Sequence, residues 1–162
     1  MKLNESLNYP QELEDKARQL KLDKIIWHFI GPLQSNKTKI ISNYAHWVHS
    51  LDREKIVNKI NNECENLSKK INGCIQVNIS EEASKSGIKP EELLDFADHL
   101  KSLENINLRG IMVLPSLSGD AEEQMIKSKK LHNKLIESCP NAKFLSMGTT
   151  NDFESAIKFG SN

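Results

Sequence analysis

Residues Trp27–Lys37 read WHFIGPLQSNK, and they continue an apolar run that begins at Lys24 (KIIWHFIG, residues 24–31). The run turns at Gly31 and Pro32 into a polar loop. A short, almost continuously apolar run that ends in Gly and Pro is typical of a strand covered on both faces, as in a parallel sheet. In parallel α/β folds the loop after such a strand lies where ligands bind. This stretch therefore predicts both the fold class and the end of the sheet at which a site would lie.

Four more short apolar runs have the length of strands. The run after position 72 alternates, with Ile75, Val77 and Ile79 on one face and polar residues between them, which is typical of a strand. The others are more evenly apolar. The strands are expected at Ala45–Leu51, Gly73–Ser80, Asn107–Leu114 and Ala142–Met147, in addition to Lys24–Gly31.

Helical patterns lie between these runs. Pro10 suits the first turn of a helix, Pro90 opens another, and Asp120 with Glu123 resembles a capping box. Asp152 is expected to cap a last short helix, and one more helix is expected over Arg53–Lys69. Strict alternation of strand and helix predicts a parallel sheet with right-handed crossovers, either an open doubly wound sheet or part of a (β/α) barrel. The predicted pattern begins with a helix, and its five strands are too few to close an eight-stranded barrel.

The overall composition indicates one soluble domain with no net charge. The chain has 162 residues, 22 basic and 22 acidic side chains, and therefore no net charge that would favour nucleic acid. Its three cysteines, Cys64, Cys74 and Cys139, form no CxxC pair, which favours reduced cytosolic thiols. No apolar run reaches the ~20 residues of a membrane span, and the N-terminus has no signal-peptide pattern. We expect a cytoplasmic protein over residues 1–162.

Three loops after predicted strands could carry chemistry: residues 30–37, 78–87 and 146–152. The last contains Ser146, Gly148 and Thr150 and leads into a helix, and small hydroxylic residues with glycine beside helix N–H groups suit a phosphate. On this stretch alone, a plain turn with an N-cap of Ser, Thr and Asp is the simpler interpretation of the same residues. Gly160 and Ser161 could add one more amide and hydroxyl.

The histidines and lysines allow several interpretations. His28 lies inside a strand, either as a buried structural residue or, by its parity, aimed at a ligand. His46 and His49 have no carboxylate or cysteine at ligand spacing, which argues against a metal site. His99 and His132 are expected to be solvated or capping. Lys37 and Lys85 could form an imine with an aldehyde if burial lowered their pKa, but ordinary solvated lysines are the simpler interpretation.

The stretch Trp27–Lys37 resembles the most diagnostic motif of the pyridoxal phosphate homeostasis proteins, which share the alanine-racemase-like barrel. Other matches follow in the same order along about residues 7–161. They are Asn8-Tyr9, Gln76–Ser80, Ser84–Gly87, Leu108–Met112, Leu145–Gly148 and Asp152–Ile157.

The resemblance implies a pyridoxal 5′-phosphate carrier or regulator in vitamin B6 balance, with no catalytic reaction. It implies a small-molecule cofactor, no nucleic acid or membrane partner, and a monomer. Carried over by position, the cofactor-binding residues would be Asn8, His28, Asn78, Ser146, Gly148, Thr150, Gly160 and Ser161, with no catalytic or metal-binding residue.

Two family segments have no counterpart in the chain: the SKTKP-like lysine motif of the first strand and the GSTxVRIG-like last strand. We therefore expect an incomplete (β/α)8 TIM barrel of alanine-racemase type without its first and last strands, unable to form the Schiff base. Its exposed edges would allow association. One alternative is a racemase-like enzyme, which needs a lysine and an opposed tyrosine, and only Tyr9 and Tyr44 are present. The other is an unrelated open α/β binding module, which strand order would decide.

Overall fold

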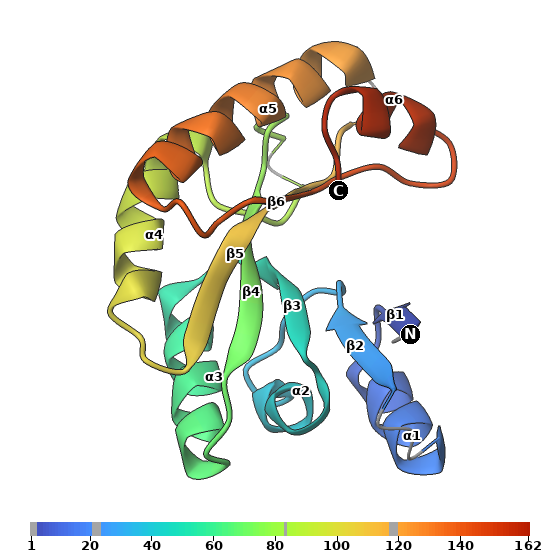
Figure 1. The fold of residues 1–162 in the computed structure, drawn as a ribbon, viewed down its shortest axis with the longest axis vertical. Helices are drawn as coiled ribbons and strands as arrows, with labels where there is room; N and C mark the ends of the chain where they lie inside the picture. Colours follow the sequence, from blue (N-terminus) through green and yellow to red (C-terminus); the bar gives the residue numbers. More distant parts are fainter. Residues whose placement is uncertain (1–2, 21–23, 83, 117–119) are drawn as a thin grey trace.

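The computed structural model describes residues 3–20, 24–82, 84–116 and 120–162, and this part of the chain forms one curled sheet with helices on its outer side (Figure 1). The sheet has six strands in the described residues, and every neighbouring pair is parallel. The strands are β1 (Leu3–Leu7), β2 (Ile25–Phe29), β3 (Trp47–Leu51), β4 (Ile71–Val77), β5 (Ile106–Val113) and β6 (Phe144–Ser146).

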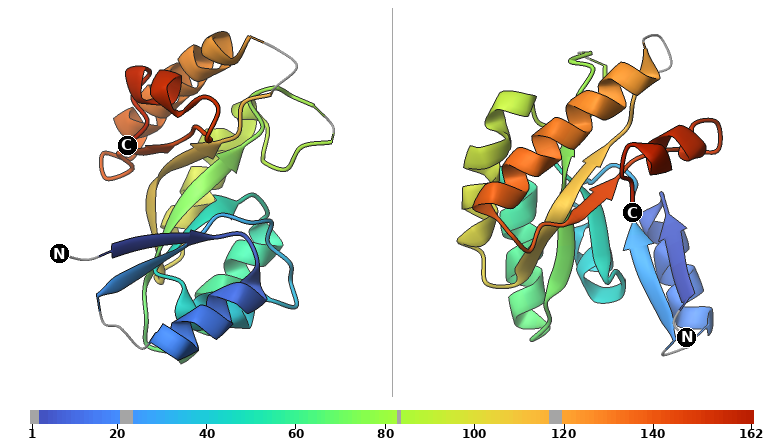
Figure 2. Two further views of the ribbon diagram at one scale, coloured as in Figure 1. Left: turned by 90° about the vertical axis from the view of Figure 1, so that its right-hand side faces the viewer. Right: turned by 45° about the horizontal axis from the view of Figure 1, so that its top comes forward.

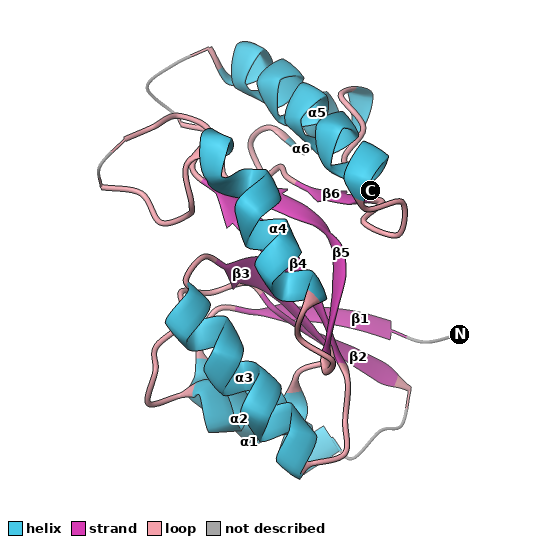
Figure 3. Cartoon of the chain, turned by 90° about the vertical axis from the view of Figure 1, so that its left-hand side faces the viewer, coloured by secondary structure: helices cyan, strands magenta, loops and turns pink. Residues whose placement is uncertain are grey.

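The strands lie in the order in which they occur along the chain, β1-β2-β3-β4-β5-β6. A doubly wound sheet reverses its order at a switch point, whereas successive right-handed crossovers in one direction place all helices on one face and curl the sheet. The alternative prediction of an unrelated open α/β module is therefore wrong. The predicted barrel type is confirmed, in the form of a half-barrel of alanine-racemase type. Figure 3 looks onto the outer side and shows α3, α4 and α5 in front of the strands.

The helices begin and end close to the positions predicted from the sequence. Pro10 starts the first helix, and the Asp120 carboxylate accepts the backbone N–H groups of Glu122 and Glu123 as an N-cap. The helices are α1 (Pro10–Leu20), α2 (Thr38–Tyr44), α3 (Glu54–Asn66), α4 (Leu93–Lys101, after the 3-10 turn Pro90–Glu92), α5 (Ala121–Ser138) and α6 (Phe153–Lys158).

The hydrophobic core fills the space between the outer face of the sheet and these helices. Phe29 of β2, Leu13 of α1 and Ile41 of α2 are fully buried in one cluster. Each such side chain stabilises the fold by about 1.5–3 kcal/mol relative to an exposed position. Burial alternates along β2, where Ile25, Trp27 and Phe29 are buried and the residues between them are only half-buried. His28 therefore lies on the other, concave face.

Three predictions about the elements are wrong. The sheet has a strand, β1, before the first predicted helix, because Leu3–Leu7 pairs with β2 although LNESL has no apolar pattern. His132 is buried rather than solvated, with Nε2 2.8 Å from the Ala142 carbonyl oxygen. Asp152 precedes α6 but makes no side-chain cap, since its carboxylate accepts the backbone N–H and the hydroxyl of Thr149 instead.

Among the described residues, no helix is both long and apolar enough to cross a membrane. The chain ends near the open side of the curl, and Figure 2 shows the C-terminal residues running back beside β6. There the backbone N–H of Asn162 donates to the Leu145 carbonyl, 3.2 Å away.

Candidate functional site

A chain of polar side chains crosses the concave face of the sheet. His28 Nε2 lies 3.3 Å from Asn4 Oδ1 on β1, and His28 Nδ1 lies 2.9 Å from His49 Nε2 on β3. His49 Nδ1 lies 2.9 Å from Ser146 Oγ on β6. The contacts bring two predicted site residues, His28 and Ser146, onto the same face and join them through His49.

Both histidines of this chain favour the neutral state. Burial, together with a smaller effect of the neighbouring His28, lowers the pKa of His49 to about 4. Burial also lowers the pKa of His28, with a smaller contribution from His46. A desolvated imidazole is harder to charge, because the imidazolium loses hydration that its neighbours do not replace.

Aromatic rings and one arginine surround the polar chain. The Trp47 ring stacks on His28 with centroids 5.4 Å apart and planes at 11°, and it meets the edge of Phe144 at 4.9 Å. The Arg109 guanidinium lies over both rings, 5.7 Å from the Trp47 centroid and 5.3 Å from that of Phe144. Cation–π contacts of this kind hold the charge over the rings. The inner face thus presents aromatic rings with a positive charge beside them.

Arg109 keeps one donor unused: its Nε is buried without a hydrogen-bond partner among the described residues. Its charge is not balanced by an acid of the strands, since the six described strands contain one carboxylate, Glu5. Glu5 acts electrostatically on Lys16 of α1, which places it on the helical side. The concave face therefore suits an aromatic ligand that carries negative charge.

A pocket of about 280 Å³ opens at the C-terminal ends of β1, β2, β4 and β5. Two predicted residues, Asn8 and Asn78, line it from opposite strands, and Gln76 and Lys85 add further polar groups. A second hollow of about 490 Å³ adjoins it, shares Lys85 and Leu114 with it, and extends to Thr149 and Asp152 after β6. Both hollows lie at the edge of the sheet predicted from the order of strands and loops.

Asn78 orders the loop that carries Lys85. Its side-chain amide donates to the Glu82 carbonyl at 2.8 Å and to the Lys85 carbonyl at 3.4 Å, and its oxygen accepts the Ser80 hydroxyl at 3.2 Å. The Lys85 ammonium is half-buried, 3.5 Å from the Leu114 carbonyl and 3.9 Å from the Glu82 carboxylate. Lys85 is therefore a residue of the pocket wall rather than the fully solvated lysine expected from the sequence.

Asn8 owes its position to a close backbone approach. A Cβ at Gly31 would lie 1.9 Å from the Asn8 carbonyl oxygen, so only glycine fits where the loop after β2 passes the end of β1. Gly31 belongs to the stretch WHFIGPLQSNK that identifies the fold. The same stretch thus shapes the pocket beside Asn8.

The remaining predicted residues gather after β6, largely engaged with one another. The Ser161 hydroxyl contacts the Met147 carbonyl at 2.7 Å and the Leu145 carbonyl at 3.1 Å, and it lies 3.3 Å from the Met147 N–H. Gly148 and Gly160 have positive φ angles of 99° and 96°. A Cβ on Gly148 would meet Ala156 of α6, and one on Gly160 would meet the Lys129 ammonium. Thr150 is exposed, and its neighbour Thr149 makes the contact to Asp152.

Sequence reasoning missed His49, Trp47 and Arg109. His49 and Trp47 lie two residues apart in β3, so the same period that places His28 inward would have placed both on the concave face. Within the described residues no group of three His, Cys, Asp or Glu could hold a metal. Arg109 carried no such signal, because the register shifts beside it, between the Gly73 and Cys74 pairs of β4 and β5.

Comparison with known proteins gives a consistent result at the level of sequence. The family described as "Alanine racemase, N-terminal domain" matches residues 7–160. The pyridoxal phosphate homeostasis protein of Pasteurella multocida is 42% identical over 161 residues, which cover 95% of this chain and 69% of that protein. The protein of the same name from Haemophilus influenzae is also 42% identical, over 95% of this chain and 68% of that protein.

Solved structures agree in fold. PipY of Synechococcus elongatus, determined without PLP, superposes with a TM-score of 0.90 at 26% identity over 97% of this chain and 76% of its own. PipY with PLP bound gives 0.86 at 24% identity over the same shares of both chains. Together with the sequence matches, these similarities show that the chain belongs to the pyridoxal phosphate homeostasis protein family, whose fold is that of the alanine racemase N-terminal domain.

Proposed function

We propose that this chain is a pyridoxal 5′-phosphate-binding protein of vitamin B6 homeostasis that acts without catalysis. Two observations support the proposal: the family relatives carry that name, and PipY has been solved with PLP bound. The observation that carries it in this chain is the concave face, where aromatic rings and Arg109 stand beside a polar chain, while Glu5, the one acid of the described strands, lies on the helical side.

The described residues fit the ring and the charge of the cofactor. Trp47 and Phe144 begin β3 and β6, so with Arg109 they would form the floor of the site below the pocket and supply positive charge to it. His28 and Ser146 would contact the ligand from the concave face, and Asn8 and Asn78 from the pocket at the mouth. Gly148, Thr150, Gly160 and Ser161 remain our candidates for the phosphate end. When bound, the cofactor supplies an aldehyde that reacts with amines; the residues named here bind and orient it.

The described strands do not fit the covalent part of cofactor binding. Within the described residues none of the six strands contains a lysine, and the nearest amine to the pocket is that of Lys85 in the loop after β4. We therefore propose that these residues hold the cofactor without a specific imine.

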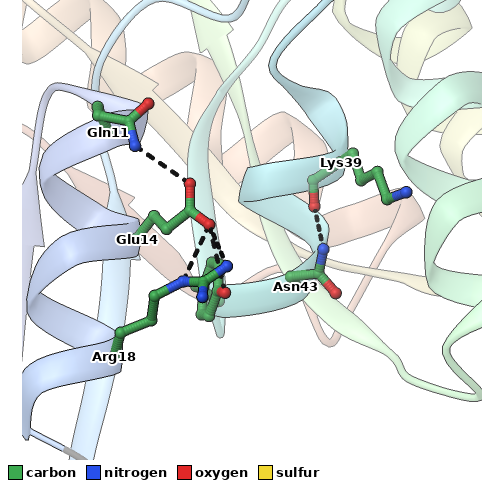
Figure 4. Close-up of polar contacts among 6 residues, drawn as sticks. Gln11, Glu14, Arg18, Lys39 and Asn43 are labelled. Carbon is green, nitrogen blue, oxygen red and sulfur yellow. Dashed lines mark hydrogen bonds and ion pairs between the residues drawn. The ribbon is translucent and has the colours of Figure 1, made fainter.

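The absence of catalysis is supported by the places of the two tyrosines. A racemase of this fold needs a tyrosine facing the cofactor, but Tyr44 lies on the outer side, its hydroxyl 3.4 Å from the Glu14 carboxylate. Figure 4 shows Glu14 bound there by Gln11 and Arg18 of α1, beside α2. Tyr9 is 70% exposed at the start of α1. Tyr44 is therefore not on the concave face, and no contact of the Tyr9 side chain with that face is seen among the described residues.

We propose a single domain that works in the cytoplasm as a monomer, which can associate through its exposed sheet edges at higher concentration, with a small molecule and not a nucleic acid as its ligand. Equal numbers of acidic and basic side chains, 22 of each, support the last point.

The proposal is tested by equilibrium dialysis of the 162-residue chain with PLP, alongside fluorescence from Trp47. The chain has two tryptophans, and Trp27 is buried in the core on the helical side, so the variant Trp47→Phe separates their signals. Binding should quench Trp47 and should weaken in Arg109→Gln. No saturable binding, or quenching that persists in Trp47→Phe, would contradict the proposed site. An alanine racemization assay with PLP should show no turnover above that of PLP alone.

A further inference from the structure

The placement of the Asn4 amide oxygen assigns a hydrogen-bond direction to the polar chain on the concave face. Asn4 Oδ1 can only accept, so the proton between it and His28 must be on Nε2 of the imidazole. In a neutral ring the Nδ1 atom of His28 is then an acceptor, and His49 Nε2 must donate to it. His49 Nδ1 therefore accepts, and the Ser146 hydroxyl donates to it. One oxygen on β1 thus sets the orientation of a hydroxyl on β6.

This direction presents the wrong group to an anion. While the Ser146 proton points at His49, the hydroxyl offers only lone pairs to the concave space, and lone pairs repel a phosphate oxygen. Charging His49 would correct this, but burial and the adjacent His28 both oppose a positive charge there.

We propose that an anionic group at Ser146 reverses the whole chain, so that His49 and His28 act as positioning residues for the anion-binding hydroxyl. In the reversed state Ser146 donates to the anion, His49 Nδ1–H donates to Ser146, and His28 Nδ1–H donates to His49 Nε2. The Asn4 amide turns over, and its Nδ2–H donates to His28 Nε2. This inference rests on the proposed function, because it takes Ser146 to face a phosphorylated ligand.

The reversal leaves the number of protons unchanged. The Ser146 proton passes to His49 Nδ1, and the proton on His49 Nε2 passes to His28 Nδ1. His28 Nε2 then releases its proton to water, and Ser146 takes one back from water. Water reaches the first end of the chain, since Asn4 is exposed and His28 is only half-buried. Both rings are neutral before and after the reversal, so neither of the two states buries a charge.

The test is long-range ¹H–¹⁵N correlation spectroscopy of the full chain with ¹⁵N-labelled histidine at pH 7. The probes are pyridoxine 5′-phosphate, which has no aldehyde, and inorganic phosphate, with binding measured separately by equilibrium dialysis. Without ligand, His28 and His49 should both show the Nε2–H tautomer. With ligand, both should show the Nδ1–H tautomer, and His99, which contacts Asn58 on the outer side, should not change.

The possible results distinguish the two proposals. If the phosphorylated probe binds and the tautomers stay as they were, or His49 becomes cationic, the reversal is overturned while the proposed function stands. If PLP and both probes fail to bind, the proposed function fails, and the reversal fails with it because no anion reaches Ser146. If the free protein lacks the Nε2–H tautomers, the inferred direction is wrong whatever binds.

Two substitutions of His49 provide a matched pair. In His49→Asn the side-chain amide lies near the position that Nδ1 of the imidazole occupies in the natural chain. There it can accept a hydrogen bond from Ser146 or donate one to it. In His49→Gln the amide instead reaches the position of the imidazole Nε2, so Ser146 loses its hydrogen-bond partner. His49→Asn should bind pyridoxine 5′-phosphate within about twofold of the natural chain, whereas His49→Gln should lose about tenfold, the worth of one hydrogen bond. His99→Gln is the control. Equal losses in both His49 variants would overturn the positioning role.

Discussion

His49 Nδ1 and Ser146 Oγ lie 2.9 Å apart, although 97 residues separate them along the chain. They belong to β3 and β6, and two further strands lie between these in the sheet. Side chains of such strands cannot meet across a flat sheet, because each strand adds almost 5 Å of separation. The contact therefore shows directly how strongly the sheet curls, and it makes the concave face one continuous site.

The buried imidazole of His49 predicts a loss of stability in acid. Its pKa falls from 6.5 to about 4 in the folded chain, so below pH 6.5 the unfolded chain binds more protons than the folded one. Stability is complete above pH 6.5 and is lost as the pH falls towards 4, by on the order of 3 kcal/mol at most. Urea unfolding at pH 7 and at pH 4.5 measures the difference. His49→Gln should show a smaller difference, and an equal one would contradict the assignment.

Gly31 predicts a linked defect in stability and in binding. In Gly31→Ala the new Cβ would collide with the Asn8 backbone oxygen, which must move away from the pocket. We expect a loss of about 1–3 kcal/mol, as for other overpacked sites, together with weaker binding of PLP. Urea unfolding and dialysis measure the two effects. Gln34→Ala, an exposed change in the same loop, serves as the control and should alter neither. A Gly31→Ala variant with normal binding would mean that the pocket at Asn8 is not used.

Covalent labelling should find no preferred lysine. We expect that incubation with PLP, borohydride reduction and peptide mapping will show scattered, substoichiometric labels, since within the described residues the strands carry no lysine. A single lysine labelled to one equivalent would refute this. Repeating the experiment with Lys85→Arg shows whether a labelled lysine is Lys85 of the pocket, because arginine keeps the charge but forms no imine.

The edge of β1 predicts self-association of this chain. Leu3 donates its backbone N–H to Lys24 across the β1–β2 pair, so by alternation the N–H of Ser6 points away from β2. An unpaired strand edge is a template for another strand. Sedimentation velocity should show association that rises with concentration and falls in Ser6→Pro, which lacks the donor.

Ser6→Ala keeps the backbone donor and serves as the control for that experiment. It should associate as the natural chain does. A sharp, reversible melt of a monomer above the usual temperatures of mesophilic proteins would contradict both the association and the marginal stability that we expect from an open curl.

The interiors of the elements were predictable because burial repeats along them. The stripe Ile56, Ile60 and Cys64 in α3 and the apolar run of β2 are buried as the sequence pattern requires. β1 was not predictable in this way. Its residues LNESL have no periodic apolar face, and the strand exists because its backbone pairs with β2. Propensity is a weak guide at such an edge, where pairing and not side-chain burial decides.

The candidate site, too, could be predicted from the sequence only in part. Asn8, Asn78 and Ser146 could be located at strand ends from the order of the elements alone, because parallel strands end at one edge of a sheet. Whether their side chains meet depends on curvature, which adds up over several strand pairs and crossovers. His132 shows the same limit, since its burial depends on a carbonyl ten residues away in the turn before β6.

By itself, the sequence determined the alternation of strand and helix and the family motif at Trp27–Lys37, and it predicted the end of the sheet at which we expect ligands to bind, since these are local patterns of burial, turns and order. The tertiary structure alone decided that the strands follow one another around a half-barrel and that His28, His49 and Ser146 form one hydrogen-bonded chain. Contacts between distant strands arise from the twist and curl accumulated by the whole sheet, and no local stretch of the chain encodes that sum.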